Sequence, residues 1–328
     1  MPESSPTQTR RGRLLRRGAS FLVLLAVAGY LAVQYVTGGT GDPACEVASA
    51  GGDGASYEFT PEQAVNAATI TAVGTARGLP ERAVAIALAT ALQESGLRNI
   101  THGDRDSLGL FQQRPSQGWG TAKEIQDPAY AAGEFYDHLV KVSGYSRLPL
   151  TVAAQRVQRS GYPEAYAKHE QDATLLAAAL TGHAAATLTC EGRQAATPTG
   201  GPDAVRAALV RDFGREVLTA AGATVTLKAP ATPTPTPSPS PTATSTALRT
   251  VTLPVSADTD TAAGTTARQR GWQLAHWAVA NASALHIENV SYAGLRWTAG
   301  NTDSEWRPVA TPKGTAKGTD AVRIVTAQ

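Results

Sequence analysis

Two alanine-rich stretches between residues 60 and 96 constrain the fold of this chain more than any other feature. Thr60 precedes Pro61 in the first stretch, and Gln63 completes a capping box, so a helix is predicted to begin here. Larger apolar residues recur among the alanines of the second stretch, which indicates a helix buried on most sides. Such helices, joined by short connections, predict a compact helical domain.

The second of these helices is predicted to carry Glu94 in its last turn and to end at Gly96. A carboxylate there faces the negative end of the helix dipole, which is unfavourable for stability. The dipole and apolar surroundings both raise the pKa of a carboxyl group, and a raised pKa suits a general acid near neutral pH. The alternative is an ordinary solvated glutamate at a helix end.

The segment SLGLFQQRP follows, with Gly109 fifteen residues after Glu94. The pair ESG and GLFQ at this spacing resembles the soluble lytic transglycosylases and goose-type lysozymes, in which a G-L-M-Q segment shapes the glycan cleft. The strings GDRDSLGLFQQRPSQGWGT and AAQRVQRS also resemble a lysozyme-like domain of membrane-anchored actinobacterial cell-wall proteins. The resemblance covers about residues 60–182 and implies an all-α lysozyme-like domain.

The resemblance implies that Glu94 is the catalytic acid and base. The candidate substrate-binding residues are Ser95, Gly109, Phe111, Gln112, Gln113, Trp119 and Gln155. Ser95 is expected to support the site without a chemical role, and the aromatic residues could be either sugar platforms or core. Family members carry an A-Y-N segment whose tyrosine approaches the catalytic glutamate. The corresponding segment here is Ala-Ala-Gln at 153–155, which lacks the tyrosine. Gln155, Tyr162 or Tyr166 is expected to take its place.

One carboxyl group is enough for a lytic transglycosylase, whereas a glycoside hydrolase generally needs two. Asp104 and Asp106 are the candidates for a second carboxylate, but aspartates in such turns usually cap their own backbone. Peptidoglycan cleavage of the lytic transglycosylase type is therefore the predicted function. The alternative is a catalytically weak or inactive lysozyme-like domain that binds peptidoglycan and scaffolds cell-wall proteins. Arg105 and Arg114 could contact peptidoglycan carboxylates or be solvated.

The N-terminal part combines the basic segment RRGRLLRR with an uncharged stretch at residues 18–36. That stretch is long enough to span a bilayer, and the arginines before it predict a cytoplasmic N-terminus with the bulk of the chain outside. A cleaved signal peptide is the alternative, but the apolar run is long for one. An oxidising exterior favours a disulfide between Cys45 and Cys190 over two free thiols.

The C-terminal part is predicted to be a small α+β domain interrupted by a proline- and threonine-rich insertion, which cannot build a core. It weakly resembles a small domain of actinobacterial cell-wall proteins whose last strand carries paired histidines, but here Val322 and Arg323 stand on that strand. The predicted organisation is 1–17 basic cytoplasmic segment, 18–36 transmembrane anchor, 37–55 linker, 56–190 lysozyme-like domain, 191–202 linker, and 203–328 α+β domain with the insertion at 229–247.

The formal net charge of +2 and the absence of nucleotide-binding motifs give no reason to expect nucleic acid as a partner. His102, Asp104 and Asp106 could be drawn as a metal site, yet loop residues this close together are more often hydrogen-bonded turn residues. No metal or cofactor is expected. The predicted partners are peptidoglycan glycan strands, the cytoplasmic membrane and proteins of cell-wall synthesis or division.

Overall fold

The predicted capping box opens helix α2 (Pro61–Ala76) in the computed structural model of the chain. Thr60 Oγ1 accepts a hydrogen bond from the Gln63 amide at 3.3 Å, and Gln63 Oε1 accepts one from the Thr60 amide at 2.7 Å. Helix α3 (Glu81–Ser95) ends at Gly96, whose left-handed backbone (φ 61°, ψ 39°) is accessible to glycine without steric cost. Both helices therefore form where the sequence predicts them.

The structure describes residues 44–159, 163–191, 200–220, 249–255, 265–300, 305–309 and 321–327. They belong to one compact unit, Pro43–Gln328. Its other helices are α4 (Ala122–Ile125), α5 (Pro128–Leu139), α6 (Leu150–Gln158), α7 (Glu170–Leu180), α8 (Gly201–Phe213), α9 (Glu216–Ala220), α11 (Ala267–Ala280), α12 (Ala282–Leu285) and the 3-10 helices η1 (Pro115–Gln117) and η2 (Pro163–His169). The strands are β1 (Cys45–Ala48), β2 (Ser56–Phe59), β3 (Leu188–Cys190), β4 (Thr250–Pro254), β5 (Ile287–Tyr292), β6 (Leu295–Thr298), β7 (Arg307–Pro308) and β8 (Ala321–Thr326).

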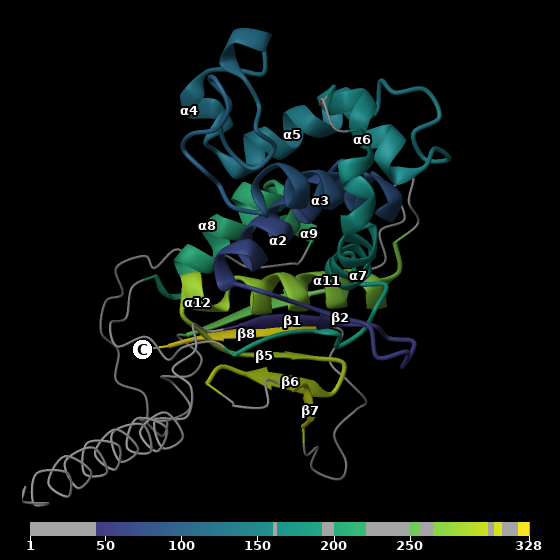
Figure 1. Cartoon of the computed structure of the whole chain (residues 1–328). Coiled ribbons are helices and arrows are strands. Elements are labelled where there is room, and N and C mark those ends of the chain that lie inside the picture. The colour runs from purple at the N-terminus through teal and green to yellow at the C-terminus, as the bar shows by residue number, and fades with distance from the viewer. Residues whose placement is uncertain are drawn as a thin grey trace, which may run out of the picture. The chain divides into compact units, whose positions relative to one another are not determined.

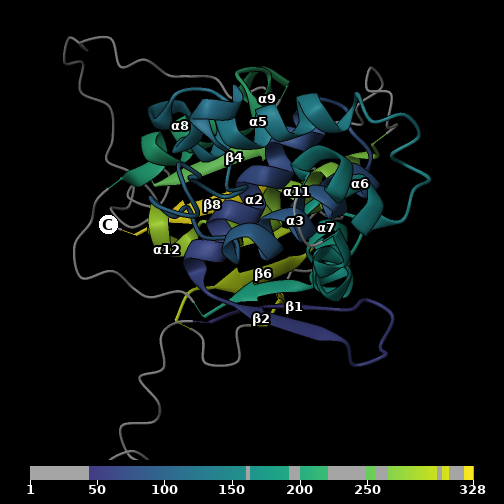
Figure 2. The same cartoon turned by 45° about the horizontal axis from the view of Figure 1, so that its top comes forward.

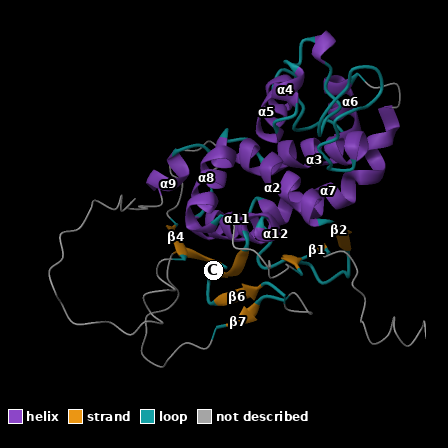
Figure 3. Ribbon diagram, turned by 90° about the vertical axis from the view of Figure 1, so that its left-hand side faces the viewer, coloured by secondary structure: helices purple, strands orange, loops and turns teal. Residues whose placement is uncertain are grey.

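Two antiparallel sheets lie beneath the helices (Figures 1 and 3). The strand orders are β2-β1-β3 and β4-β8-β5-β6-β7. The smaller sheet draws β2 and β3 from the two ends of the segment that was expected to be all-α, and its central strand β1 falls in the expected linker. The predicted all-α fold of this segment is therefore wrong. Cys45 and Val47 of β1 are buried while their neighbours are exposed, but four residues are too few for this alternation to be recognised in a sequence.

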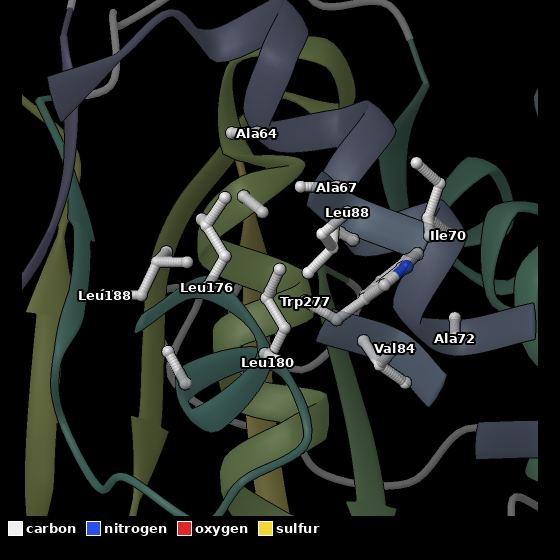
Figure 4. Close-up of a cluster of buried hydrophobic side chains, with 14 of the residues drawn as sticks. Ala64, Ala67, Ile70, Ala72, Val84, Leu88, Leu176, Leu180, Leu188 and Trp277 are labelled. Atoms are coloured by element: carbon white, nitrogen blue, oxygen red, sulfur yellow. The ribbon is translucent and has the colours of Figure 1, made fainter. Parts of the chain in front are cut away.

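Helix α11 lies between the strands and the upper helices, where it contacts β3, β5 and β8 on one side and α2 and α7 on the other. Figure 2 shows the helical layer from above. Trp277 of α11 is buried among side chains of α2 and α3, including Ile70, Val84 and Leu88 (Figure 4). The helical segment and the C-terminal segment thus share one hydrophobic core.

A buried carboxylate adds a polar link inside this core. Asp212 of α8 has a fully buried side chain, and its Oδ2 accepts hydrogen bonds from Trp277 Nε1 at 2.8 Å and from Thr69 Oγ1 at 3.3 Å. Three helices, α2, α8 and α11, therefore meet at one acceptor.

The predicted disulfide between Cys45 and Cys190 is confirmed, and it joins directly opposite residues of β1 and β3. Within the described ranges, no helix combines the length and the apolar character needed to cross a membrane. The predicted transmembrane segment at 18–36 lies outside these ranges, as do Tyr162 and the whole of the predicted insertion at 229–247.

Candidate functional site

The carboxyl group of Glu94 lies at the C-terminal end of α3 and is held by two side chains from later parts of the chain. Tyr166, in η2, is fully buried and donates its hydroxyl hydrogen to Glu94 Oε1 at 2.6 Å. Gln158, the last residue of α6, also hydrogen-bonds the Glu94 side chain, and its Nε2 donates to the Phe111 carbonyl at 2.7 Å. Three elements therefore converge on one acid.

Burial raises the pKa of Glu94, and the hydrogen bonds from Tyr166 and Gln158 oppose this effect without cancelling it. Because Glu94 occupies the last turn of α3, the negative end of the helix dipole also disfavours its ionised form. A carboxyl group in these surroundings keeps its proton to a higher pH than an exposed glutamate does. It is therefore suited to donate a proton to a ligand.

The loop after α3 is fixed against Glu94 by backbone and hydroxyl contacts. The Ser95 hydroxyl lies 2.8 Å from the Leu110 carbonyl and so ties the end of α3 to this loop. Leu108 and Gln113 form a reciprocal pair of backbone hydrogen bonds, at 2.9 and 3.0 Å. Between them Gln112 adopts a left-handed backbone (φ 48°), a conformation that non-glycine residues take up mainly where surrounding contacts impose it.

Gly109 is required for this loop to approach α4. Its φ is +74°, and a Cβ atom at this position would come within 2.7 Å of the Ile125 carbonyl oxygen. Gly103 has a similar role, because a Cβ there would collide with the Gln112 amide. The glycines of the GLFQ and HGD stretches thus permit close packing of the loop.

A cleft of about 810 Å³ opens beside Glu94. Its walls come from the end of α3, the loop before η1, the end of α5 with the residues after it, and the end of α6. The lining residues are Glu94, Asp104, Arg105, Ser107, Gln112, Gln113, Arg114, Gln117, Trp119, His138, Lys141, Val142, Arg156, Val157, Gln158 and Arg159. Polar and charged side chains predominate, so the cleft suits a hydrophilic ligand.

Of the predicted site residues, the structure brings Glu94, Gln112, Gln113 and Trp119 together in the cleft. Trp119 is half-buried, and its ring lies 4.1 Å from the imidazole of His138, centroid to centroid, which leaves an aromatic surface in the cleft wall. The remaining predicted site residues do not line the cleft.

Phe111 is fully buried and stacks on Phe135 with ring centroids 4.6 Å apart, so the structure places it in the core instead of the cleft. Ser95 and Gly109 are buried supports of the loop. Gln155 is half-buried on α6 and does not line the cleft. The amide that reaches Glu94 belongs instead to Gln158, three residues further along the same helix.

The two candidate second carboxylates differ in their surroundings. Asp106 accepts a hydrogen bond from the Ser116 amide at 2.9 Å and pairs with Arg114 Nε at 2.6 Å; contacts with Ser116 and with Arg114 hold its pKa well below the usual range. Asp106 is therefore a structural ion. Asp104 does line the cleft with Glu94, and it is the second carboxylate that a hydrolytic reaction would have available.

One buried histidine, on α11, belongs to the core and does not line the cleft. His276 is fully buried beside Trp272 and its Nδ1 donates to the Ala179 carbonyl at 2.7 Å, while burial lowers its pKa to about 4, so it is neutral. Nowhere in the described ranges do three histidine, cysteine or acidic side chains gather closely enough to hold a metal ion.

Comparison with known proteins gives no identity for the chain: no family model matches it, and no curated protein matches it significantly. The functional assignment therefore depends on the chemistry of the site.

Proposed function

We propose that this chain cleaves the glycan strands of peptidoglycan by a lytic transglycosylase reaction, with Glu94 as acid and then as base. The supporting observation is the Glu94–Tyr166 hydrogen bond of 2.6 Å in a polar cleft, where burial raises the pKa of the carboxyl group. Tyr166 occupies the role that the tyrosine of the A-Y-N segment has in the resembling family, although it comes from a later segment.

The proton geometry follows from the direction of this hydrogen bond. Because the Tyr166 hydroxyl donates to Oε1, the acidic proton of Glu94 belongs on Oε2. Oε2 would donate this proton to the glycosidic oxygen as the bond between C1 and that oxygen breaks. The resulting carboxylate would then take the proton from the 6-hydroxyl of the same sugar as its oxygen bonds to C1. The products are a 1,6-anhydro end and a free hydroxyl, with Glu94 reprotonated.

The cleft and the disulfide support this assignment. Trp119 offers a flat surface for a sugar ring, and the half-buried amide of Gln112 can pair with hydroxyl and acetamido groups. The Cys45–Cys190 bond fits an oxidising location such as the outer face of the cytoplasmic membrane, where peptidoglycan lies. Proteins of cell-wall synthesis or division would be the partners there.

The test uses the oxidised full-length chain with purified peptidoglycan and identifies the released fragments by mass spectrometry. Glu94→Gln should abolish release of anhydro-ended fragments. Glu58→Gln is the matched control, because Glu58 is exposed on β2 and does not line the cleft. Hydrated, reducing ends would instead indicate a hydrolase, and Asp104→Asn would then be inactive. Binding without release by the wild type would support the alternative function, a glycan-binding scaffold.

A further inference from the structure

The basic side chains of the cleft differ in whether they are neutralised. Arg114 is paired with Asp106. Among the described residues, no carboxylate forms an ion pair with Arg105, Lys141, Arg156 or Arg159, although all four line the cleft and are exposed. Elsewhere in the same unit, Arg77, Arg82 and Arg249 each have an acidic partner. Four cations without an acidic partner among the described residues therefore line the cleft beside Glu94.

Three of these cations lie on one wall. Arg156 is in the last turn of α6, Arg159 is its C-cap, and Lys141 follows α5, which packs against α6. The negative end of the α6 dipole favours cations at these two positions, whereas like charges placed close together repel each other. No carboxylate among the described residues pairs with them to relieve this repulsion.

The backbone of Arg159 strengthens the argument. Its φ of 52° is left-handed, and at such a C-cap glycine or asparagine would be less strained. Arg105, a cleft residue of the loop before η1, is also left-handed, with a φ of 58°. Strain of this kind is concentrated at functional sites. Two of the cleft's arginines thus stand at positions where glycine would be less strained.

We propose that Lys141, Arg156 and Arg159 form an anion-binding wall that selects glycan strands bearing free carboxylates near the scissile bond. This inference rests on the proposed function for its choice of a glycan. Guanidinium groups pair with carboxylates in bidentate geometry, and such pairing beside an acid would position the strand as well as select it. In peptidoglycan these carboxylates belong to the peptide substituents.

The experiment compares two forms of one substrate. Peptidoglycan is freed of phosphodiester-linked polymers with hydrofluoric acid, and half of it is then amidated with carbodiimide and ammonia, which neutralises the carboxylates without altering the glycan. The wild type should cleave the untreated form about tenfold faster at low salt, since three exposed charge contacts of ordinary strength combine to such a ratio. Added salt should reduce this preference.

The triple variant Lys141→Gln, Arg156→Gln, Arg159→Gln should lose the preference, so that its rates on the two forms become equal. The control triple variant Lys123→Gln, Arg268→Gln, Arg323→Gln removes the same charge from exposed residues outside the cleft and should retain the preference. Equal wild-type rates on both forms, or an equal loss of rate on both by the cleft variant, would overturn the proposal.

Binding of the Glu94→Gln protein to the two forms, measured by co-sedimentation, tests the wall separately from catalysis. Preferential binding to the carboxylate-bearing form supports the wall even if no cleavage is found, in which case only the proposed reaction fails. Equal binding to the two forms refutes the wall and leaves the proposed reaction to its own test.

Discussion

The Cys45–Cys190 disulfide closes a loop with a sequence separation of 145 residues, and its removal is expected to be among the most costly double substitutions in the chain. In the chain-entropy account, a loop of this length restricts the unfolded state by about 5 kcal/mol at 25 °C. Whole domains are typically stable by about 5–15 kcal/mol, so the bond supplies a large share of the total.

The test uses urea denaturation of the wild type and of a Cys45→Ala, Cys190→Ala variant, followed by circular dichroism. With a urea m value of about 3 kcal/mol per M, the midpoint should fall by about 1.7 M. Reductant should lower the wild-type midpoint towards the value of the variant and leave the variant unchanged, which controls for side effects of the reductant.

The kinetic consequence is also specific. The native sheet pairs residues 45 and 190 whether or not the bond is present, so few native contacts are lost with it. The stability change should therefore appear mainly as slower folding, with unfolding little affected. A loss of less than about 1 kcal/mol would refute the reasoning, because it would mean that the unfolded chain already holds these ends together.

Three further predictions concern the site and the core. Tyr166→Phe removes a hydrogen bond that favours ionised Glu94, so the pKa of Glu94 should rise and the high-pH limb of the cleavage profile should move to higher pH; an unmoved limb would contradict the hydrogen bond. Glu94→Gln should be more thermostable than the wild type at mildly alkaline pH but not at acidic pH below the ordinary glutamate pKa. Burial raises the folded-state pKa above the unfolded one, so the wild type loses stability as pH rises between the two values. Asp212→Ala should cost roughly 2 kcal/mol of unfolding free energy in urea denaturation, because Trp277 Nε1 and Thr69 Oγ1 lose their buried acceptor. Asp203→Ala on the same helix, with a nearly fully exposed side chain, should leave the stability almost unchanged.

The parts of the fold that follow from local sequence were predictable. The capping box at Thr60, the glycine end of α3 and the burial of its alanine-rich length all depend on residues within one or two turns of each other. The strands β1, β2 and β3 were not predicted, because each has three or four residues and the sheet is completed by pairing Cys45 with the distant Cys190. Pairing at that range leaves little periodic signal.

The candidate site was predictable only in part, for the same reason. Glu94 and Trp119 belong to recognisable local patterns, and the structure places both in the cleft. Phe111 has the same aromatic character as Trp119, yet it stacks on Phe135 inside the core, and nothing in its own segment distinguishes the two environments. Tyr166 was one of two candidate tyrosines, and its contact with Glu94 depends on the packing of η2 against α3. Gln158 was not predicted, because the A-Y-N segment of the resembling family corresponds to residues 153–155 and so indicated Gln155.

These contacts explain how a glutamate is tolerated at an unfavourable end of a helix. Ionised Glu94 is disfavoured by burial and by the dipole of α3, and the fold offsets this only partly, through the hydrogen bonds from Tyr166 and Gln158. If the hydrogen bonds cancelled the effect of burial completely, the pKa of Glu94 would fall to the ordinary range and the carboxyl group would be ionised near neutral pH. Without these hydrogen bonds, the carboxyl group would stay protonated but release its proton less readily. Intermediate compensation suits a group that must donate a proton and then recover one within a single reaction. Tyr166 and Gln158 both affect the chemistry through the pKa of Glu94. Gln158→Leu should therefore move the pH profile of cleavage in the same direction as Tyr166→Phe.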